Sequence, residues 1–84
     1  MRIPVTNVVT IGEVAKKVRR EQGIRQEDMA SILGASHVFL RDVEHGKPTV
    51  QLGKVLRLLD ELGITLILEL PDEPEADSDR NGRP

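Results

Sequence analysis

Apolar residues recur at three- and four-residue steps in four segments of this chain, which predicts four helices that each bury one face. The first stripe falls within residues 10–22 and consists of Ile11, Val14, Ala15 and Val18. Shorter stripes follow in residues 26–33 and 36–44, and residues 49–62 carry a leucine-rich one with Leu52, Val55, Leu56, Leu59 and Leu62. A glycine, which often ends a helix, follows each stripe: Gly23, Gly34, Gly46 and Gly63.

Several residues are placed to cap the predicted helix starts. Thr10 and Glu13 have the spacing of a capping box for the first helix. Ser36 and Thr49 stand where their hydroxyls would accept from the first N–H groups of the third and fourth helices. The predicted helical region therefore begins at residue 10.

The pattern differs at the ends of the chain. Residues 1–9 are rich in β-branched side chains but contain Pro4, which predicts a loose arm or a short edge strand. Residues 71–84 are acidic and interrupted by prolines, so we expect a disordered tail. The predicted organisation is an arm over residues 1–9, one domain over residues 10–70 and a tail over residues 71–84.

Residues 64–70 alternate in polarity and predict a single strand with one buried face. The side chains expected on that face are Ile64, Leu66, Leu68 and Leu70. A lone strand needs a neighbour, because its backbone donors and acceptors would otherwise stay unpaired and its apolar edge would aggregate. Pairing with a second copy of the chain is the favoured prediction, and pairing with residues 3–5 is the alternative.

Composition narrows the class of protein. The 84 residues are enough for one domain with a small core, so a dimer or a partner is expected. The absence of cysteine excludes disulfides and thiolate chemistry. Without a long apolar run or a basic leader, neither a membrane span nor a signal peptide is predicted, and we expect a cytoplasmic protein.

The charges favour no strong global field. Residues 1–70 carry ten Lys and Arg against nine Asp and Glu, whereas residues 71–84 carry two against five. Any binding of nucleic acid would therefore depend on where the charges lie. The two histidines, His37 and His45, are eight residues apart without cysteine, so no metal site or cofactor is predicted. Enzyme activity is not expected either, since no nucleophile–base pair or phosphate loop is present.

Residues 26–33 and 36–44 have the layout of a helix-turn-helix, two short helices joined by a tight glycine turn. Ala30 is small where the helices would cross, and Gly34 can adopt the positive φ that the turn needs. Apolar residues fall where the unit would pack on the first helix: Met29, Leu33, Ala35, Leu40 and Val43.

Residues 10–63 resemble the Xre/Cro/C1 family of DNA-binding domains, and within them the segment GIRQEDMASILGASHVFLRDVEHGK is similar to the usual helix-turn-helix pattern of that family. The continuation GKPTVQLGKVLRLLDELGITLIL is similar to HipB-type antitoxins, in which a leucine-rich helix and one strand follow the helix-turn-helix. The resemblance implies a mostly α, lambda-repressor-like domain of four to five helices, with the C-terminal strand pairing across a homodimer. It also implies double-stranded operator DNA and a HipA-like serine/threonine kinase toxin as partners.

By the same resemblance, the helix that follows Ser36 lies in the major groove. The residues expected to read bases are Ser36, His37, Val38 and Arg41. Those expected to contact phosphate are Gln26, Arg25, Lys47 and the basic face of the first helix, formed by Lys16, Lys17, Arg19 and Arg20, unless that face is merely solvated. Phe39 either packs between the second and third helices or touches DNA, while Glu44 and His45 are expected to be structural.

The leading hypothesis is a dimeric repressor that binds operator DNA, acts as the antitoxin of a HipA-like kinase and represses their shared operon. One alternative is a free-standing Xre-type repressor. A second alternative, favoured by the nearly neutral body of the chain, is a protein-interaction module that does not bind DNA.

Overall fold

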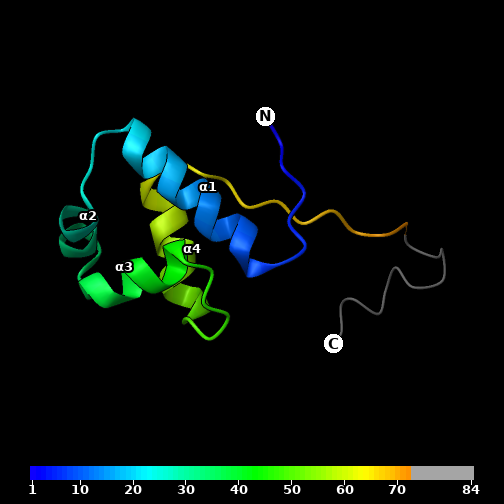
Figure 1. Ribbon diagram of the computed structural model, residues 1–84. Helices are drawn as coiled ribbons and strands as arrows, with labels where there is room; N and C mark the ends of the chain where they lie inside the picture. Colours follow the sequence, from blue (N-terminus) through cyan, green and yellow to red (C-terminus); the bar gives the residue numbers. More distant parts are fainter. Residues whose placement is uncertain (73–84) are drawn as a thin grey trace.

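Four helices make up the regular structure of the computed structural model, which describes residues 1–72 (Figure 1). They are α1 (Val8–Glu21), α2 (Gln26–Leu33), α3 (His37–Glu44) and α4 (Leu52–Glu61). Both α1 and α2 pack against α3, and α4 contributes to the same core. The predicted mostly α fold with four helices is confirmed. Residues 73–84 of the predicted tail lie outside the described residues.

The predicted caps of α1 and α4 are wrong. Asn7, not Thr10, caps α1, because its Oδ1 accepts from the N–H groups of Val9 at 2.9 Å and Thr10 at 3.3 Å. Val8 and Val9 therefore belong to α1, which shortens the arm. Helix α4 begins at Leu52 after Gln51, and no side chain caps it, so Thr49 does not have the expected role.

The turn between α2 and α3 is formed as predicted. Gly34 has a φ of 65° and a ψ of 30°, a left-handed conformation that glycine adopts without steric cost. The backbone N–H of Ala35 donates to the carbonyl of Ala30 at 2.9 Å and closes the end of α2. Ser36 then caps α3, since its Oγ accepts from the N–H of Phe39 at 3.0 Å.

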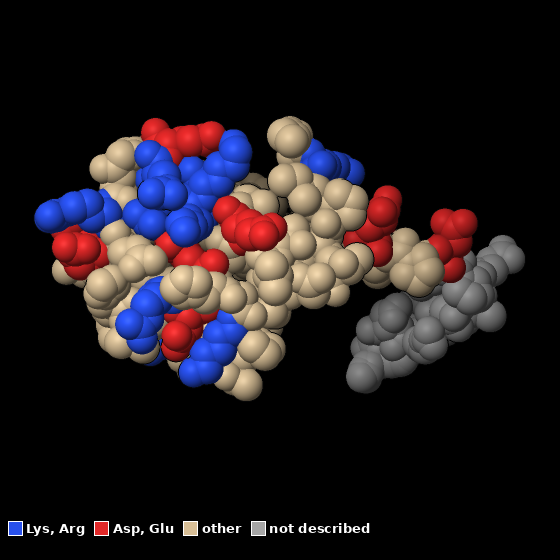
Figure 2. All heavy atoms as spheres, viewed as in Figure 1, with Lys and Arg blue, Asp and Glu red and all other residues tan. Residues whose placement is uncertain are grey.

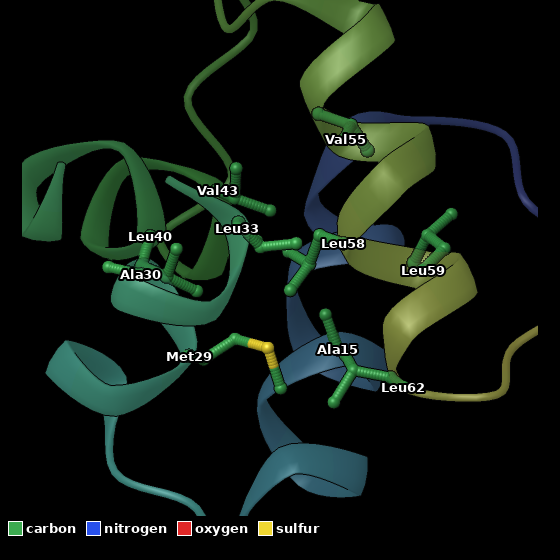
Figure 3. Close-up of a cluster of buried hydrophobic side chains, with 10 residues drawn as sticks. All are labelled: Ala15, Met29, Ala30, Leu33, Leu40, Val43, Val55, Leu58, Leu59 and Leu62. Carbon is green, nitrogen blue, oxygen red and sulfur yellow. The ribbon is translucent and has the colours of Figure 1, made fainter. Parts of the chain in front are cut away.

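The core lies where all four helices meet, and its largest fully buried side chains are Met29, Leu40 and Leu58 (Figure 3). The buried apolar set is Ala15, Met29, Ala30, Leu33, Leu40, Val43, Val55, Leu58, Leu59 and Leu62. Val55, Leu59 and Leu62 of the predicted α4 stripe are buried, but Leu52 and Leu56 are 65% and 42% exposed, and Leu58, which the prediction left out, is buried. Ile32, an apolar residue of α2, is 53% exposed and lies outside the core.

Close approach of α1 to α3 depends on two glycines. A Cβ atom at Gly12 would overlap the backbone carbonyl oxygen of Val43, so only glycine permits this crossing. Gly46, after α3, has a φ of 76°, and a Cβ there would lie 2.8 Å from the side chain of Val9. These contacts hold the C-terminal end of α3 against the first half of α1.

The predicted strand over residues 64–70 is not formed: residues 1–72 contain helices and irregular segments only. A single copy of the chain offers no strand edge to pair with, and no backbone hydrogen bond joins this segment to residues 3–5 in the described part of the chain. The segment leaves the helical body after Gly63 (Figure 1). Leu66, Leu68 and Leu70 are 44%, 78% and 75% exposed, while Ile64 is half-buried.

No helix in the described residues is long and apolar enough to cross a membrane.

Candidate nucleic-acid interface

Helix α3 has one face in the core and one face in solvent. Leu40 and Val43 are 0% and 3% exposed and anchor the inner face. The residues that the sequence placed on the opposite side are all exposed, as the helical period requires: Ser36, His37, Val38 and Arg41. The structure therefore brings the four predicted base-reading residues together on one outward surface, which we call the α3 face.

A buried ion pair ties the end of α3 to α1. Arg19 donates from Nε to Glu44 Oε2 at 2.6 Å and from a terminal guanidinium nitrogen to Oε1 at 2.9 Å. A third donor of Arg19 reaches the carbonyl of Ile24 at 2.6 Å. The two side chains are only 9% and 1% exposed. Arg19 is thus part of the interior and not of the basic face that the sequence predicted for it.

The environment of Glu44 keeps its carboxylate ionised. Burial acts to raise the pKa of Glu44, but the hydrogen bonds from Arg19 and Gln26 and the charges of Arg19 and Lys16 outweigh it. The net result is a pKa lowered from the ordinary value. Glu44 thus has a structural role, as expected, because it fixes the end of α3 to Arg19 of α1.

Gln26, the first residue of α2, extends this arrangement to the α3 face. Its Nε2 donates to Glu44 Oε1 at 2.8 Å, and its Oε1 lies 2.7 Å from Nε2 of His37. Four side chains from three helices therefore form one continuous polar chain, Arg19–Glu44–Gln26–His37, which we call the relay. Both ends of the Gln26 amide are engaged within the protein. The backbone N–H groups in the first turn of α2, which no side chain caps, are therefore more accessible to a phosphate than the Gln26 side chain is.

The remaining predicted contacts are exposed and mostly paired. Arg25 pairs with Asp28 at 3.0 Å. The hydrogen bond and charge of Asp28, with the charge of Glu27, raise the pKa of Arg25. Lys47 lies 3.5 Å from Asp42. Within residues 1–72, Arg41 makes no ion pair.

Basic side chains gather over α1 and recur near the start of α2 and around α3, with acidic side chains between them (Figure 2). The exposed basic residues of α1 are Lys17 and Arg20, with Lys16 half-buried beside them. Lys17 is paired with Glu21 at 2.6 Å. The surface is thus mixed in charge. On the α3 face the long cationic side chain is Arg41, which has no counter-ion among the described residues.

Phe39 is half-buried and packs against the core. The Nζ of Lys54, from α4, lies 5.9 Å from the centre of its ring. The ring therefore lies on the side of α3 that Lys54 of α4 approaches. His45 is exposed and follows α3 as its C-cap residue.

Sequence reasoning missed the relay. A signal was present for Arg19, because it falls four residues after buried Ala15 and so lies on the inner face of α1. No comparable signal marks Gln26 or His37 as partners, since they are 11 residues apart and meet only through the turn. Among the described residues, no group of three or more His, Asp or Glu side chains could hold a metal ion.

These features define a helix-turn-helix protein, in which α2 and α3 join through Gly34, rest on a core shared with α1 and α4, and leave one side of α3 open. Residues 16–68 match the helix-turn-helix family, and the chain belongs to that family. The resemblance inferred from the motif is confirmed.

Two kinds of relatives accompany that match. An uncharacterized HTH-type transcriptional regulator of Sinorhizobium fredii, y4mF, is 43% identical over 63 residues, which make up 75% of this chain and 83% of the relative. Among solved structures, chains from a HipA–HipB–O2–O3 complex and a HipB–O4 20mer complex have TM-scores of 0.75 and 0.74. Each is 17% identical and covers 84% of this chain and 100% of its own, so the likeness shows a shared fold.

Proposed function

We propose that this chain is a sequence-specific DNA-binding repressor that inserts α3 into the major groove of its operator. One observation carries the proposal: the α3 face presents a capped helix start and Arg41, which has no ion-pair partner within residues 1–72, on a side of the molecule that the core does not use. In helix-turn-helix proteins the first turns of the second helix contact base edges. The description of the S. fredii relative as a transcriptional regulator supports the same assignment.

The proposed contacts divide into base and phosphate contacts. Ser36, His37, Val38 and Arg41 face the bases, and Arg41 has the forked donors that suit guanine O6 and N7. Arg25, Lys47 and the first N–H groups of α2, beginning at Gln26, face phosphates. The surface ion pairs of Arg25 and Lys47 are weak interactions, so phosphate oxygens can replace their carboxylate partners.

Phe39 has a supporting role in this proposal. Its ring braces α3 against α4, with Lys54 over one side, and so fixes the angle at which α3 enters the groove. Its contact with DNA is at most a sugar or a thymine methyl at the edge of the groove.

Binding of the full chain to a labelled fragment of its own promoter, beside a scrambled fragment and across a salt series, tests the proposal. We expect preference for the promoter and affinity that falls steeply with salt, because phosphate contacts release counterions. Arg41→Ala should lose the preference, whereas Arg57→Ala, an equal loss of charge on the exposed side of α4, should keep it. Equal, weak binding to both fragments would reject DNA reading and favour a protein-interaction module.

The proposal includes a symmetric homodimer in which residues 64–70 of two copies pair as strands. Its support is the exposure of Leu66, Leu68 and Leu70 in a segment whose backbone has no ladder partner within residues 1–72. Pairing would satisfy the backbone groups and cover apolar side chains. A two-fold axis would also place two α3 helices about 34 Å apart, one turn of DNA.

Sedimentation of the full chain, with and without Leu68→Lys, tests the dimer. We expect a dimer that the substitution converts to a monomer with unchanged helix content. Ile32→Lys is the matched control, because Ile32 is also exposed but lies on α2. A wild-type monomer at high concentration, or an unaffected Leu68→Lys dimer, would exclude strand pairing.

The last part of the proposal is a partner, a HipA-like serine/threonine kinase toxin for which this chain is the antitoxin and with which it represses a shared operon. Its support is the fold shared with chains of HipB, which is found together with HipA in one of those structures. A kinase-like gene beside its own would be co-expressed with this chain, and co-purification and a growth assay would test the partnership. Promoter binding without such a partner would instead identify a free-standing repressor.

A further inference from the structure

The relay fixes which atoms of His37 donate and which accept. It begins at Glu44, whose carboxylate is ionised and can only accept hydrogen bonds. Both Glu44 oxygens already receive donors from Arg19. The Gln26 amide must therefore turn its NH₂ group toward Glu44, in agreement with the 2.8 Å contact between Gln26 Nε2 and Glu44 Oε1.

This orientation determines the state of the imidazole. With its NH₂ group on Glu44, Gln26 turns its carbonyl oxygen toward His37 Nε2 at 2.7 Å. A carbonyl oxygen only accepts, so Nε2 must carry a proton and donate. A neutral imidazole has one ring proton, which leaves Nδ1 unprotonated with a free lone pair. Nδ1 makes no hydrogen bond to any residue in the described part of the chain.

His37 lies on the exposed α3 face. His37 is the first residue of α3, follows the capping residue Ser36 and is exposed. Its neighbours Val38 and Ser36 carry no charge, and no carboxylate of residues 1–72 forms an ion pair with its ring. If α3 reads DNA, this acceptor belongs to the first residue of the reading helix, and the amine donors that the major groove offers are cytosine N4 and adenine N6.

We propose that His37 is a specificity-determining residue whose Nδ1, held as an acceptor by Arg19, Glu44 and Gln26, selects a base that carries an exocyclic amine. The inference rests on the proposed DNA-binding function and adds to it the chemical class of base at one position in each half-site. Gln26 is then a positioning residue, because it acts on the base only through His37.

The tautomer can be measured without DNA. Long-range proton–nitrogen correlation spectra of the ¹⁵N-labelled full chain at neutral pH should show His37 as a single Nε2–H tautomer. His45 is an internal control, because it is exposed and its ring makes no hydrogen bond among the described residues. In Gln26→Met, His37 should become a mixture of tautomers. An Nδ1–H tautomer or a mixture in the wild type would overturn the inference.

The base contact is tested on duplexes selected by the wild-type chain from a randomised library. Single substitutions in a selected duplex, compared between the wild type and His37→Ala, locate the position that depends on His37. Replacing adenine there by purine, or cytosine by 2-pyrimidinone, removes only the amine. We expect this to weaken the wild type about two- to tenfold, as for one hydrogen bond, and to leave His37→Ala unchanged.

The possible results separate the two proposals. Selection of no preferred duplex would reject the DNA-binding function and the inference with it. A preferred duplex without any position that depends on His37 would overturn the inference alone. So would a duplex in which His37→Ala changes the effect of replacing guanine by 7-deazaguanine but not the effect of removing an amine. Because His37 is exposed, His37→Ala should keep the fold, and thermal unfolding followed by circular dichroism checks this. The base-contact test compares only the wild type with His37→Ala, so it holds even if Gln26→Met is less stable.

Discussion

Replacing Glu44 with glutamine should destabilise the fold strongly, although the two side chains have nearly the same size. The change leaves the Arg19 guanidinium, whose side chain is 9% exposed, without a counter-ion. Removing one partner of a buried ion pair costs about 3–5 kcal/mol. The total free energy of unfolding of a domain of this size is only about 4–11 kcal/mol, so Glu44→Gln should lose a large fraction of it.

Urea unfolding followed by the circular dichroism of the helices measures this loss. Intrinsic fluorescence is unsuitable because the chain has no Trp and no Tyr. All variants are compared at one protein concentration, since a dimer would make the stability depend on concentration. The double variant Arg19→Met/Glu44→Leu should recover most of the loss, because an apolar pair of similar volume replaces a buried ion pair at little cost.

A loss of less than about 1 kcal/mol for Glu44→Gln would refute this reasoning, because it would place the pair in the range of surface ion pairs. A double variant no more stable than Glu44→Gln would also contradict it. Such a result would mean that the pair supplies packing or orientation that apolar side chains cannot replace.

The pKa of Glu44, the close contact at Gly12 and the Asn7 cap each lead to a further prediction. Because the folded-state pKa of Glu44 is lowered, the contribution of its ionised carboxylate to stability is complete above the unfolded-state pKa of about 4.3 and is lost as pH falls through the folded-state pKa. The fall in melting temperature on acidification should therefore be smaller in Glu44→Gln than in the wild type. Gly12→Ala should cost about 1–3 kcal/mol in urea unfolding, because its Cβ meets backbone, whereas Gly53→Ala, with open space around it, should stabilise by about 0.5–1 kcal/mol. Asn7→Ala should lower stability by about 1 kcal/mol, whereas Thr10→Ala should change it by less than about 0.5 kcal/mol. A larger loss for Thr10→Ala than for Asn7→Ala would show that Thr10 caps α1.

Much of the helix-turn-helix was predictable because its determinants are local. The bounds of α2, the left-handed Gly34 and the Ser36 cap each depend on residues within a few positions of one another. The α3 face was also predictable, because burial of Leu40 and Val43 leaves the other side of the helix in solvent. Local competition between candidate caps explains the error at α1, where Asn7 supplies the cap three residues before Thr10.

The expected strand was not found because strand formation is not a local property. The alternation of residues 64–70 predicts which side chains would share a face, but a strand requires backbone partners on another segment or another chain. One copy of the chain supplies none within residues 1–72. The pattern therefore remains a prediction about a dimer.

By itself the sequence determined the four helical segments, the turn between α2 and α3 and the family to which the chain belongs, because helical periodicity and turn chemistry act over a few residues. Only the tertiary structure decided that Arg19 is buried against Glu44, 25 residues away, and that Gln26 connects this pair to His37. Those contacts arise where three helices converge, and the low exposure of Arg19 and Glu44 there favours hydrogen bonds between side chains that are distant in sequence. The packing of the helices thus sets the hydrogen-bonding character of a side chain on the α3 face.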